Sequence, residues 1–139
     1  LEDKNININN IENTRIVPYI YNMEEIMNVS DVIVARSGAM TITEISNLGK
    51  PSILIPLPNV SENHQLYNAK VLESIGAAKI ILNEDLDENN LNNTIEDIIL
   101  NKSKLEQMGK KALTVAVDNV EDKIYKEIKE VLNKGDKNV

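Results

Sequence analysis

Short runs of apolar, often β-branched residues alternate along the chain with longer segments whose apolar residues recur every three or four positions. The first pattern indicates strands and the second indicates helices. We therefore predict strands at 15–20, 31–35, 52–56 and 78–82, and helices after Asn22, at about 40–48 and 62–74, and in three stretches beyond Asp87. Strands that alternate with helices imply right-handed parallel crossovers. The predicted fold class is α/β, a Rossmann-like doubly wound parallel sheet with C-terminal helices.

The run at 31–35 is nearly continuous in Val, Ile and Ala, which predicts a strand buried on both faces. Gly49 is placed to end the helix predicted at 40–48. Pro56 and Pro58 are placed to end the strand predicted at 52–56 in a loop.

Polar residues mark the predicted helix starts, and apolar residues mark the predicted buried faces. Capping boxes are predicted for Asn22 with Glu25, Ser103 with Glu106 and Asp118 with Glu121, and a single cap for Asp87. The predicted core positions are Ile26, Met27, Leu91, Ile95, Ile98, Ile99, Leu105, Met108, Ala112, Ile124, Ile128, Val131 and Leu132.

The chain has 139 residues, which fits one domain. We place that domain at 14–134, after a polar, Asn-rich and loosely ordered lead-in at 1–13 and before a frayed tail at 135–139. The chain begins at Leu1 rather than Met, so we expect it to start inside a longer protein.

The formal net charge of −7 argues against binding to nucleic acid or general adhesion to anionic lipid. It does not exclude a small anionic ligand, because local amides and one Arg can hold a phosphate. No apolar run approaches the 18 or so residues of a membrane span. One His and no Cys exclude the usual zinc clusters, and no dinucleotide or Walker A motif occurs, so neither metal nor cofactor is expected.

Ligands of open α/β sheets bind beyond the carboxyl ends of the strands, which here points to loops 19–23, 36–41 and 56–65. In the second loop, Gly38 permits close approach to the backbone, the following helix offers free amides to an anion, and Arg36 adds positive charge. The same residues also fit an ordinary strand–helix turn with a solvated Arg36.

Glu44 suits a vicinal diol, but Thr41 and Glu44 also have capping-box spacing. Gln65 and Asn68 share a helix face and offer the donors and acceptors that sugar hydroxyls need. The single histidine, His64, is more typical of a surface or packing residue than of a catalytic base.

Four blocks in this order resemble the MurG family of UDP-N-acetylglucosamine transferases, which make lipid II. They are V-P-Y-I at 17–20, D-V-I-V-A-R-S-G-A-M-T-I-T-E at 31–44, G-K-P at 49–51 and N-H-Q-L-Y-N-A at 63–69. The resemblance covers about 15–82 and implies a two-domain GT-B enzyme, of which this chain is most of the C-terminal domain.

The resemblance also implies roles for individual residues. The Ile20 backbone is expected to meet the uracil edge and Glu44 to hold the ribose hydroxyls. The substrate-binding set is completed by Ala39, Met40 and Thr41 toward the phosphates and sugar, Gln65 and Asn68 toward the sugar, and Arg36 and Ser37, which match the motif. Catalytic residues are expected in the missing N-terminal domain, and no metal is expected.

By this resemblance the chain is the donor-binding part of a hexosyltransferase that converts lipid I to lipid II in peptidoglycan synthesis. Lipid I would bind through the missing domain, and the chain alone is expected to be inactive. The full-length protein would be peripheral at the cytoplasmic face of the plasma membrane.

Two other functions stay open at this point. The chain could be a noncatalytic nucleotide-sugar-binding module that needs a separate partner subunit. It could also belong to another GT-B enzyme that glycosylates a glycolipid.

Overall fold

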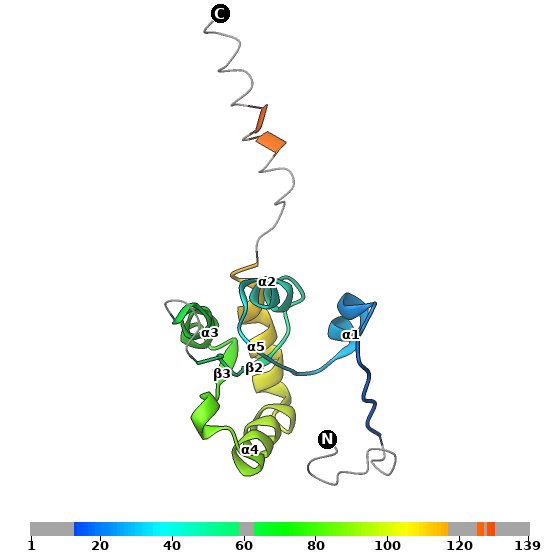
Figure 1. Cartoon of the computed structure of the whole chain (residues 1–139), viewed down its shortest axis with the longest axis vertical. Coiled ribbons are helices and arrows are strands. Elements are labelled where there is room, and N and C mark those ends of the chain that lie inside the picture. Colours follow the sequence, from blue (N-terminus) through cyan, green and yellow to red (C-terminus); the bar gives the residue numbers. More distant parts are fainter. Residues whose placement is uncertain (1–12, 59–62, 117–124, 127, 130–139) are drawn as a thin grey trace, which may run out of the picture.

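The computed structural model describes residues 13–58, 63–116, 125–126 and 128–129 (Figure 1). Helices and strands alternate through the described part. They are α1 (Met23–Val29), β1 (Ile33–Ala35), α2 (Ala39–Asn47), β2 (Ser52–Leu54), α3 (His64–Ser74), β3 (Ala78–Ile80), the 3₁₀ turn η4 (Asn83–Asp85), α4 (Glu88–Ile99) and α5 (Lys102–Leu113).

The described strands form one parallel sheet in the order β1-β2-β3, in which Val34 faces Ile53 and Ile53 faces Lys79. Successive strands of one direction require crossovers, and α2 and α3 supply them. Both helices lie on one side of the sheet, while α4 lies on the other (Figure 1). The predicted parallel α/β fold is confirmed.

Two apolar cores follow from the alternation of side chains along β2. Leu54 belongs to the core that contains Ile45 of α2 and Leu72 of α3. Ile53 belongs to the other core, with Ile98 of α4 and Met108 of α5. All six side chains are buried, so β2 carries helices on both faces, as the central strand of a parallel sheet should.

The predictions for the outer segments need correction. Residues 15–20 form no strand, and Pro18 interrupts the run with a bend. The strand predicted at 31–35 is limited to β1, and Val34 is 41% exposed rather than buried. The reason is that β1 is the edge of the described sheet and has a neighbour on one side only. β2 and β3 also end before the predicted 56 and 82.

One predicted cap is confirmed and two are wrong. Asp87 Oδ1 accepts from the Asn90 backbone N–H at 2.8 Å, as predicted. The cap of α5 is Asn101 instead of Ser103, because α5 starts two residues earlier than the capping-box pattern suggested. Asn22 does precede α1, yet its side chain bonds Glu25 Oε2 and caps no backbone N–H.

The predicted buried faces are confirmed at Met27, Ile98, Met108 and Ala112, and Leu91, Ile95 and Leu105 pack partly buried against the second core. Two are wrong, since Ile26 is 41% and Ile99 47% exposed. Each is adjacent in sequence to a buried residue of its helix, Met27 in α1 and Ile98 in α4, and so lies on a neighbouring, exposed face. The helix predicted from Asp118 falls almost wholly outside the described residues, and Ile128, which is described, is exposed.

Two glycines bring α5 against the turn that follows α2. Gly49 has a φ of +61°, the left-handed conformation predicted for a residue that ends a helix. Gly109 packs so closely on this turn that a Cβ there would lie 2.6 Å from the Gly49 carbonyl oxygen. Lys50, which follows Gly49 in this turn, donates from Nζ to the Asn28 and Ser30 carbonyls at the end of α1. One short turn thus anchors both α5 and α1.

The described part contains no helix long and apolar enough to cross a membrane. The predicted borders of the domain at 14 and 134 stay a prediction, since residues 1–12 and 130–139 lie outside the described residues.

Candidate functional site

The turn from β1 into α2 leaves open space where a ligand would meet backbone amides. Gly38 is the N-cap of α2 and supplies no capping side chain, so the first-turn amides of Ala39, Met40 and Thr41 have no acceptor from a cap. A Cβ at Gly38 would meet only Thr41 Oγ1, at 4.0 Å. The φ of −63° suits any residue, so neither backbone conformation nor packing demands glycine here. An empty approach to a helix N-terminus fits an anion such as a phosphate.

Ser37 joins this turn to the start of α3. Its side chain is fully buried and its Oγ donates to the Gln65 carbonyl at 2.7 Å. Asn68 Nδ2 donates back to the Ser37 carbonyl at 3.1 Å. The two bonds fix the first turns of α2 and α3 against each other. Ser37 is therefore enclosed, whereas Asn68 Oδ1 has no hydrogen bond to the described residues and can serve as an acceptor.

The side chain of Gln65 is oriented by the loop after β2. The Leu57 backbone N–H donates to Gln65 Oε1 at 3.0 Å. Because a backbone N–H requires an oxygen acceptor, this bond sets the orientation of the amide, with Oε1 on the Leu57 N–H and Nε2 as the remaining donor. Gln65 can thus donate to a sugar hydroxyl, while the nearby Asn68 Oδ1 can accept from one.

Arg36 lies across the carboxyl ends of all three described strands. From the end of β1, its Nη1 donates to the Ile55 carbonyl at 3.2 Å and the Pro56 carbonyl at 3.5 Å, both beyond β2. The same atom donates to Asn83 Oδ1 at 2.9 Å, just after β3. Arg36 is accordingly hydrogen-bonded across the strand ends, while the residue also stays exposed to solvent, as the interpretation of an ordinary strand–helix turn expected.

Glu44 lies in the second turn of α2 and not at its start. Because α2 begins at Ala39, Thr41 is already inside the helix and cannot be the N-cap, so the capping-box interpretation is wrong. The Glu44 side chain is exposed, and within the described residues its carboxylate has no hydrogen bond or ion pair. Glu44 is thus left to bind something from outside the chain or solvent.

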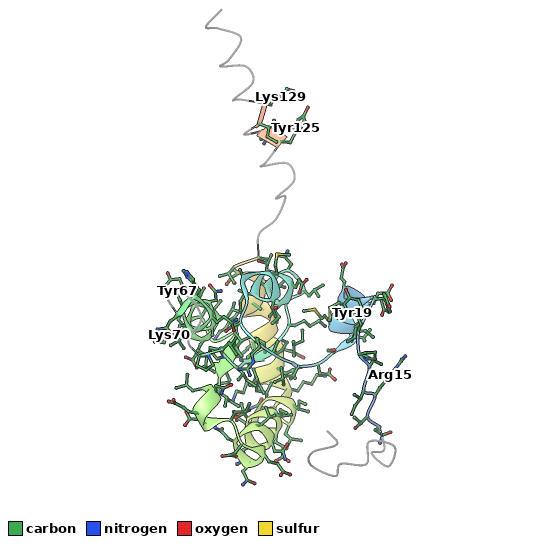
Figure 2. All side chains as sticks on the ribbon, viewed as in Figure 1. Arg15, Tyr19, Tyr67, Lys70, Tyr125 and Lys129 are labelled. Carbon is green, nitrogen blue, oxygen red and sulfur yellow. The ribbon has the colours of Figure 1, made fainter. Side chains whose placement is uncertain are left out.

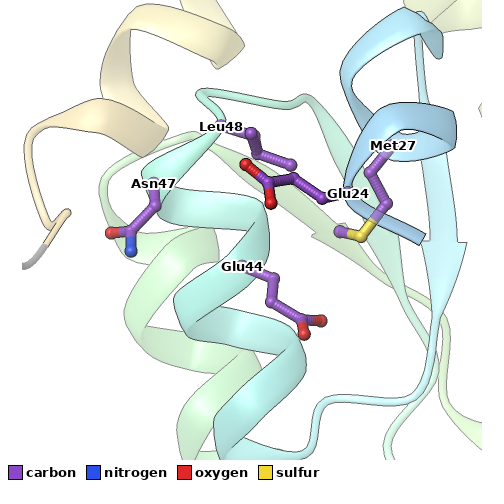
Figure 3. A pocket seen from close by; sticks show the side chains of 5 residues that line it. All are labelled: Glu24, Met27, Glu44, Asn47 and Leu48. Atoms are coloured by element: carbon purple, nitrogen blue, oxygen red, sulfur yellow. The ribbon is translucent and has the colours of Figure 1, made fainter. Parts of the chain in front are cut away.

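Glu44 lines a pocket of about 270 Å³ between α1 and α2. Met27 and Leu48 give the pocket an apolar surface, and Glu24 of α1 lines it together with Glu44 (Figure 3). A flat apolar surface beside carboxylates suits a nucleoside, whose ring is apolar on its faces and whose ribose donates hydrogen bonds.

Ile20 lies partly buried just before the turn into α1. The rings of Tyr19 and Tyr21 on either side of it meet edge to face, with centroids 5.0 Å apart. Figure 2 shows Tyr19 beside α1 and Tyr67 on α3, with α2 between the two helices in this view. The predicted site residues are therefore spread along one edge of the molecule, from the segment before α1, over the start of α2, to the start of α3.

The described residues hold no group of three or more His, Asp or Glu that could bind a metal ion. His64, the first residue of α3, is exposed and forms an interaction within the chain.

The sequence profile of the glycosyltransferase family 28 C-terminal domain matches residues 1–130 of the 139. The chain belongs to this family. The resemblance to MurG is confirmed by both sequence and structure. The family 28 domain superposes on the crystal structure of Acinetobacter baumannii MurG with a TM-score of 0.76 and 32% identity, over 84% of this chain and 35% of that one.

Its curated relatives include two named UDP-N-acetylglucosamine--N-acetylmuramyl-(pentapeptide) pyrophosphoryl-undecaprenol N-acetylglucosamine transferase. The protein of Oenococcus oeni is 43% identical over 124 residues, which cover 89% of this chain and 33% of the relative. The protein of Acetivibrio thermocellus is 41% identical over 120 residues, which cover 86% of this chain and 32% of the relative. The chain therefore spans about a third of the length of these relatives.

Sequence reasoning missed three contributors to this edge: Asn83, the Leu57 backbone N–H and Glu24. Asn83 could have been found, because it directly follows a predicted strand and so belongs to a fourth carboxyl-end loop. Leu57 belongs to the candidate loop 56–65, but the bond from its N–H depends on the path of that loop and could not be predicted. Glu24 had no signal, since its place in the pocket depends on how α1 lies beside α2.

Proposed function

We propose that this chain is the UDP-N-acetylglucosamine-binding domain of a transferase that converts lipid I to lipid II in peptidoglycan synthesis. Membership of glycosyltransferase family 28 and the names of the relatives support the reaction. The edge at the strand carboxyl ends supports the location of the donor site, where α/β sheets bind nucleotides.

The observation that carries the proposal is the open turn at Gly38. It combines free helix amides with space for a ligand, and it lies beside Gln65 and Asn68, to which Ser37 ties it. A diphosphate at the start of α2 would be stabilised by the amides and the helix dipole. The attached sugar would then meet the donor of Gln65 and the acceptor of Asn68.

The nucleoside occupies the other half of the edge in this proposal. The uracil meets the backbone of Ile20, and the ribose hydroxyls donate to the carboxylate of Glu44. Ala39, Met40 and Thr41 face the phosphates and the sugar, while Arg36 and Ser37 serve the site by holding its loops.

Transfer also needs an acceptor and a base, held together with the donor. We propose that lipid I binds to the remaining part of the protein, which the relatives contain and this chain does not span. The full-length protein would act as a peripheral protein at the cytoplasmic face of the membrane.

Gly38→Ser tests the open turn without weakening the fold. Serine is a preferred N-cap, so the free energy of unfolding should stay within about 0.5 kcal/mol or rise. The new hydroxyl would fill the approach and bond the first-turn amides itself. Because charge-assisted hydrogen bonds are worth about 1.5–3 kcal/mol, UDP affinity should fall about tenfold or more.

Isothermal titration with UDP and with uridine measures this effect. Uridine lacks the phosphates and should bind wild type and Gly38→Ser alike. Equal UDP affinity in the two proteins would show that the phosphates do not meet this turn.

A further inference from the structure

The edge contains a set of hydrogen bonds that ends at Gln65 and begins at Asn83, outside the predicted site. Asn83 Oδ1 accepts from Arg36 Nη1 at 2.9 Å, across 47 positions of sequence. The same Nη1 donates to the carbonyls of Ile55 and Pro56. Leu57, the next residue, donates its N–H to Gln65 Oε1. The end of β3 is thus connected through three hydrogen-bonded steps to the side chain proposed to meet the sugar.

Each step restrains the next for a physical reason. A guanidinium at the surface loses side-chain entropy when it is ordered, and the Asn83 oxygen compensates by accepting a charge-assisted bond. The ordered guanidinium binds the last carbonyls of the β2 end, where the ladder to β1 has stopped. The position of these carbonyls fixes the Leu57 N–H, and that N–H fixes the orientation of the Gln65 amide.

We infer that Asn83 and Arg36 are positioning residues for the donor sugar, acting through Leu57 and Gln65. This inference rests on the proposed function, because it requires Gln65 to contact the sugar of UDP-N-acetylglucosamine. It assigns Arg36 an indirect role, since its Nη1 donates to acceptors within the protein, the Ile55 and Pro56 carbonyls and Asn83 Oδ1. The network therefore controls affinity for the sugar part of the donor and not for its nucleotide part.

A comparison of two ligands separates these roles. UDP contains the nucleotide alone, whereas UDP-N-acetylglucosamine adds the sugar, so the ratio of their dissociation constants reports the sugar contacts. Loss of the Asn83 oxygen should reduce the preference for UDP-N-acetylglucosamine over UDP about fivefold to tenfold, the effect of losing one hydrogen bond between neutral groups, here the bond from Gln65 to the sugar. Affinity for UDP itself should change by less than about twofold.

The test uses titration calorimetry on the full-length protein that contains this sequence. Asn83→Ala removes the acceptor oxygen, and Asn83→Asp keeps it at the same distance from the backbone and should retain the preference. Asn93→Ala, the same substitution at an exposed position of α4, is the matched control. Asn83→Ala is also combined with Gln65→Ala, in whose presence it should have no further effect on the ratio.

The outcomes divide clearly. A similar loss of UDP and UDP-N-acetylglucosamine affinity in Asn83→Ala would overturn the inference and indicate that Arg36 acts on the diphosphate. An unchanged ratio in Asn83→Ala, with a reduced ratio in Gln65→Ala, would overturn the positioning role and leave the proposed sugar contact intact. An unchanged ratio in Gln65→Ala would remove the sugar contact itself and the inference with it.

Discussion

Gly109→Ala should destabilise the domain by up to about 2 kcal/mol, because an additional carbon in a tightly packed site costs about 1–3 kcal/mol and the better helix propensity of alanine offsets part of it. The added Cβ would lie 2.6 Å from the Gly49 carbonyl oxygen, and that oxygen belongs to a backbone in the left-handed conformation. Alanine gains about 1 kcal/mol of helix propensity over glycine, so the net effect is the clash less this gain. The turn cannot easily move away, since the residue after Gly49, Lys50, donates hydrogen bonds to two carbonyls at the end of α1.

Urea unfolding followed by circular dichroism measures the change. Lys110→Ala is the control, because its side chain is exposed on the same helix and should alter stability by no more than about 0.5 kcal/mol. A Gly109→Ala protein as stable as wild type would show that α5 does not pack on the 49–51 turn as described.

Glu44→Gln should weaken UDP binding about ten- to a hundredfold, since charge-assisted hydrogen bonds to a ribose diol are worth about 1.5–3 kcal/mol. The carboxylate is exposed and without a partner in the described residues, and it lies in the second turn of α2 rather than at its cap. The substitution should therefore leave the unfolding free energy within about 0.5 kcal/mol of wild type.

The dependence on the diol distinguishes a hydrogen bond from a general effect of charge. Wild type should prefer UDP over its 2′-deoxy analogue, and Glu44→Gln should lose most of that preference. Glu24→Gln makes the same change of charge in the same pocket from α1, and its effect on the preference should be smaller (Figure 3). If wild type and Glu44→Gln share one UDP to deoxy-UDP ratio, Glu44 is not the ribose ligand.

The order of helices and strands could be predicted because local patterns determine it. The continuous apolar run at 53–55 and the glycine at 49 indicate a buried strand and a helix end. The exposure of Val34 could not be predicted. Its strand, β1, has the composition of an inner strand but has a neighbouring strand on one side only in the described sheet. Composition reports what a strand can tolerate, and topology decides what covers it.

For the candidate site too, features set by local sequence could be predicted, and features set by contacts between distant segments could not. The motif around Gly38 and the side-chain amides of Gln65 and Asn68 could be located from the sequence, because each lies in a loop or helix start that follows a predicted strand. The engagement of Arg36 could not, since its partners come from two later strands. Glu44 was ambiguous for a related reason. The same four residues fit a cap or a second turn, and only the start of α2 at Ala39 decides between them.

Residue-level NMR during a titration with UDP tests the central claim most directly. Amide signals that shift should belong to Ile20, to residues 38–44 and to Gln65, which line the proposed donor site along the carboxyl ends of the strands. Addition of UDP-N-acetylglucosamine should extend the shifts to Asn68. Shifts confined to α4, on the other side of the sheet, would contradict the account (Figure 1).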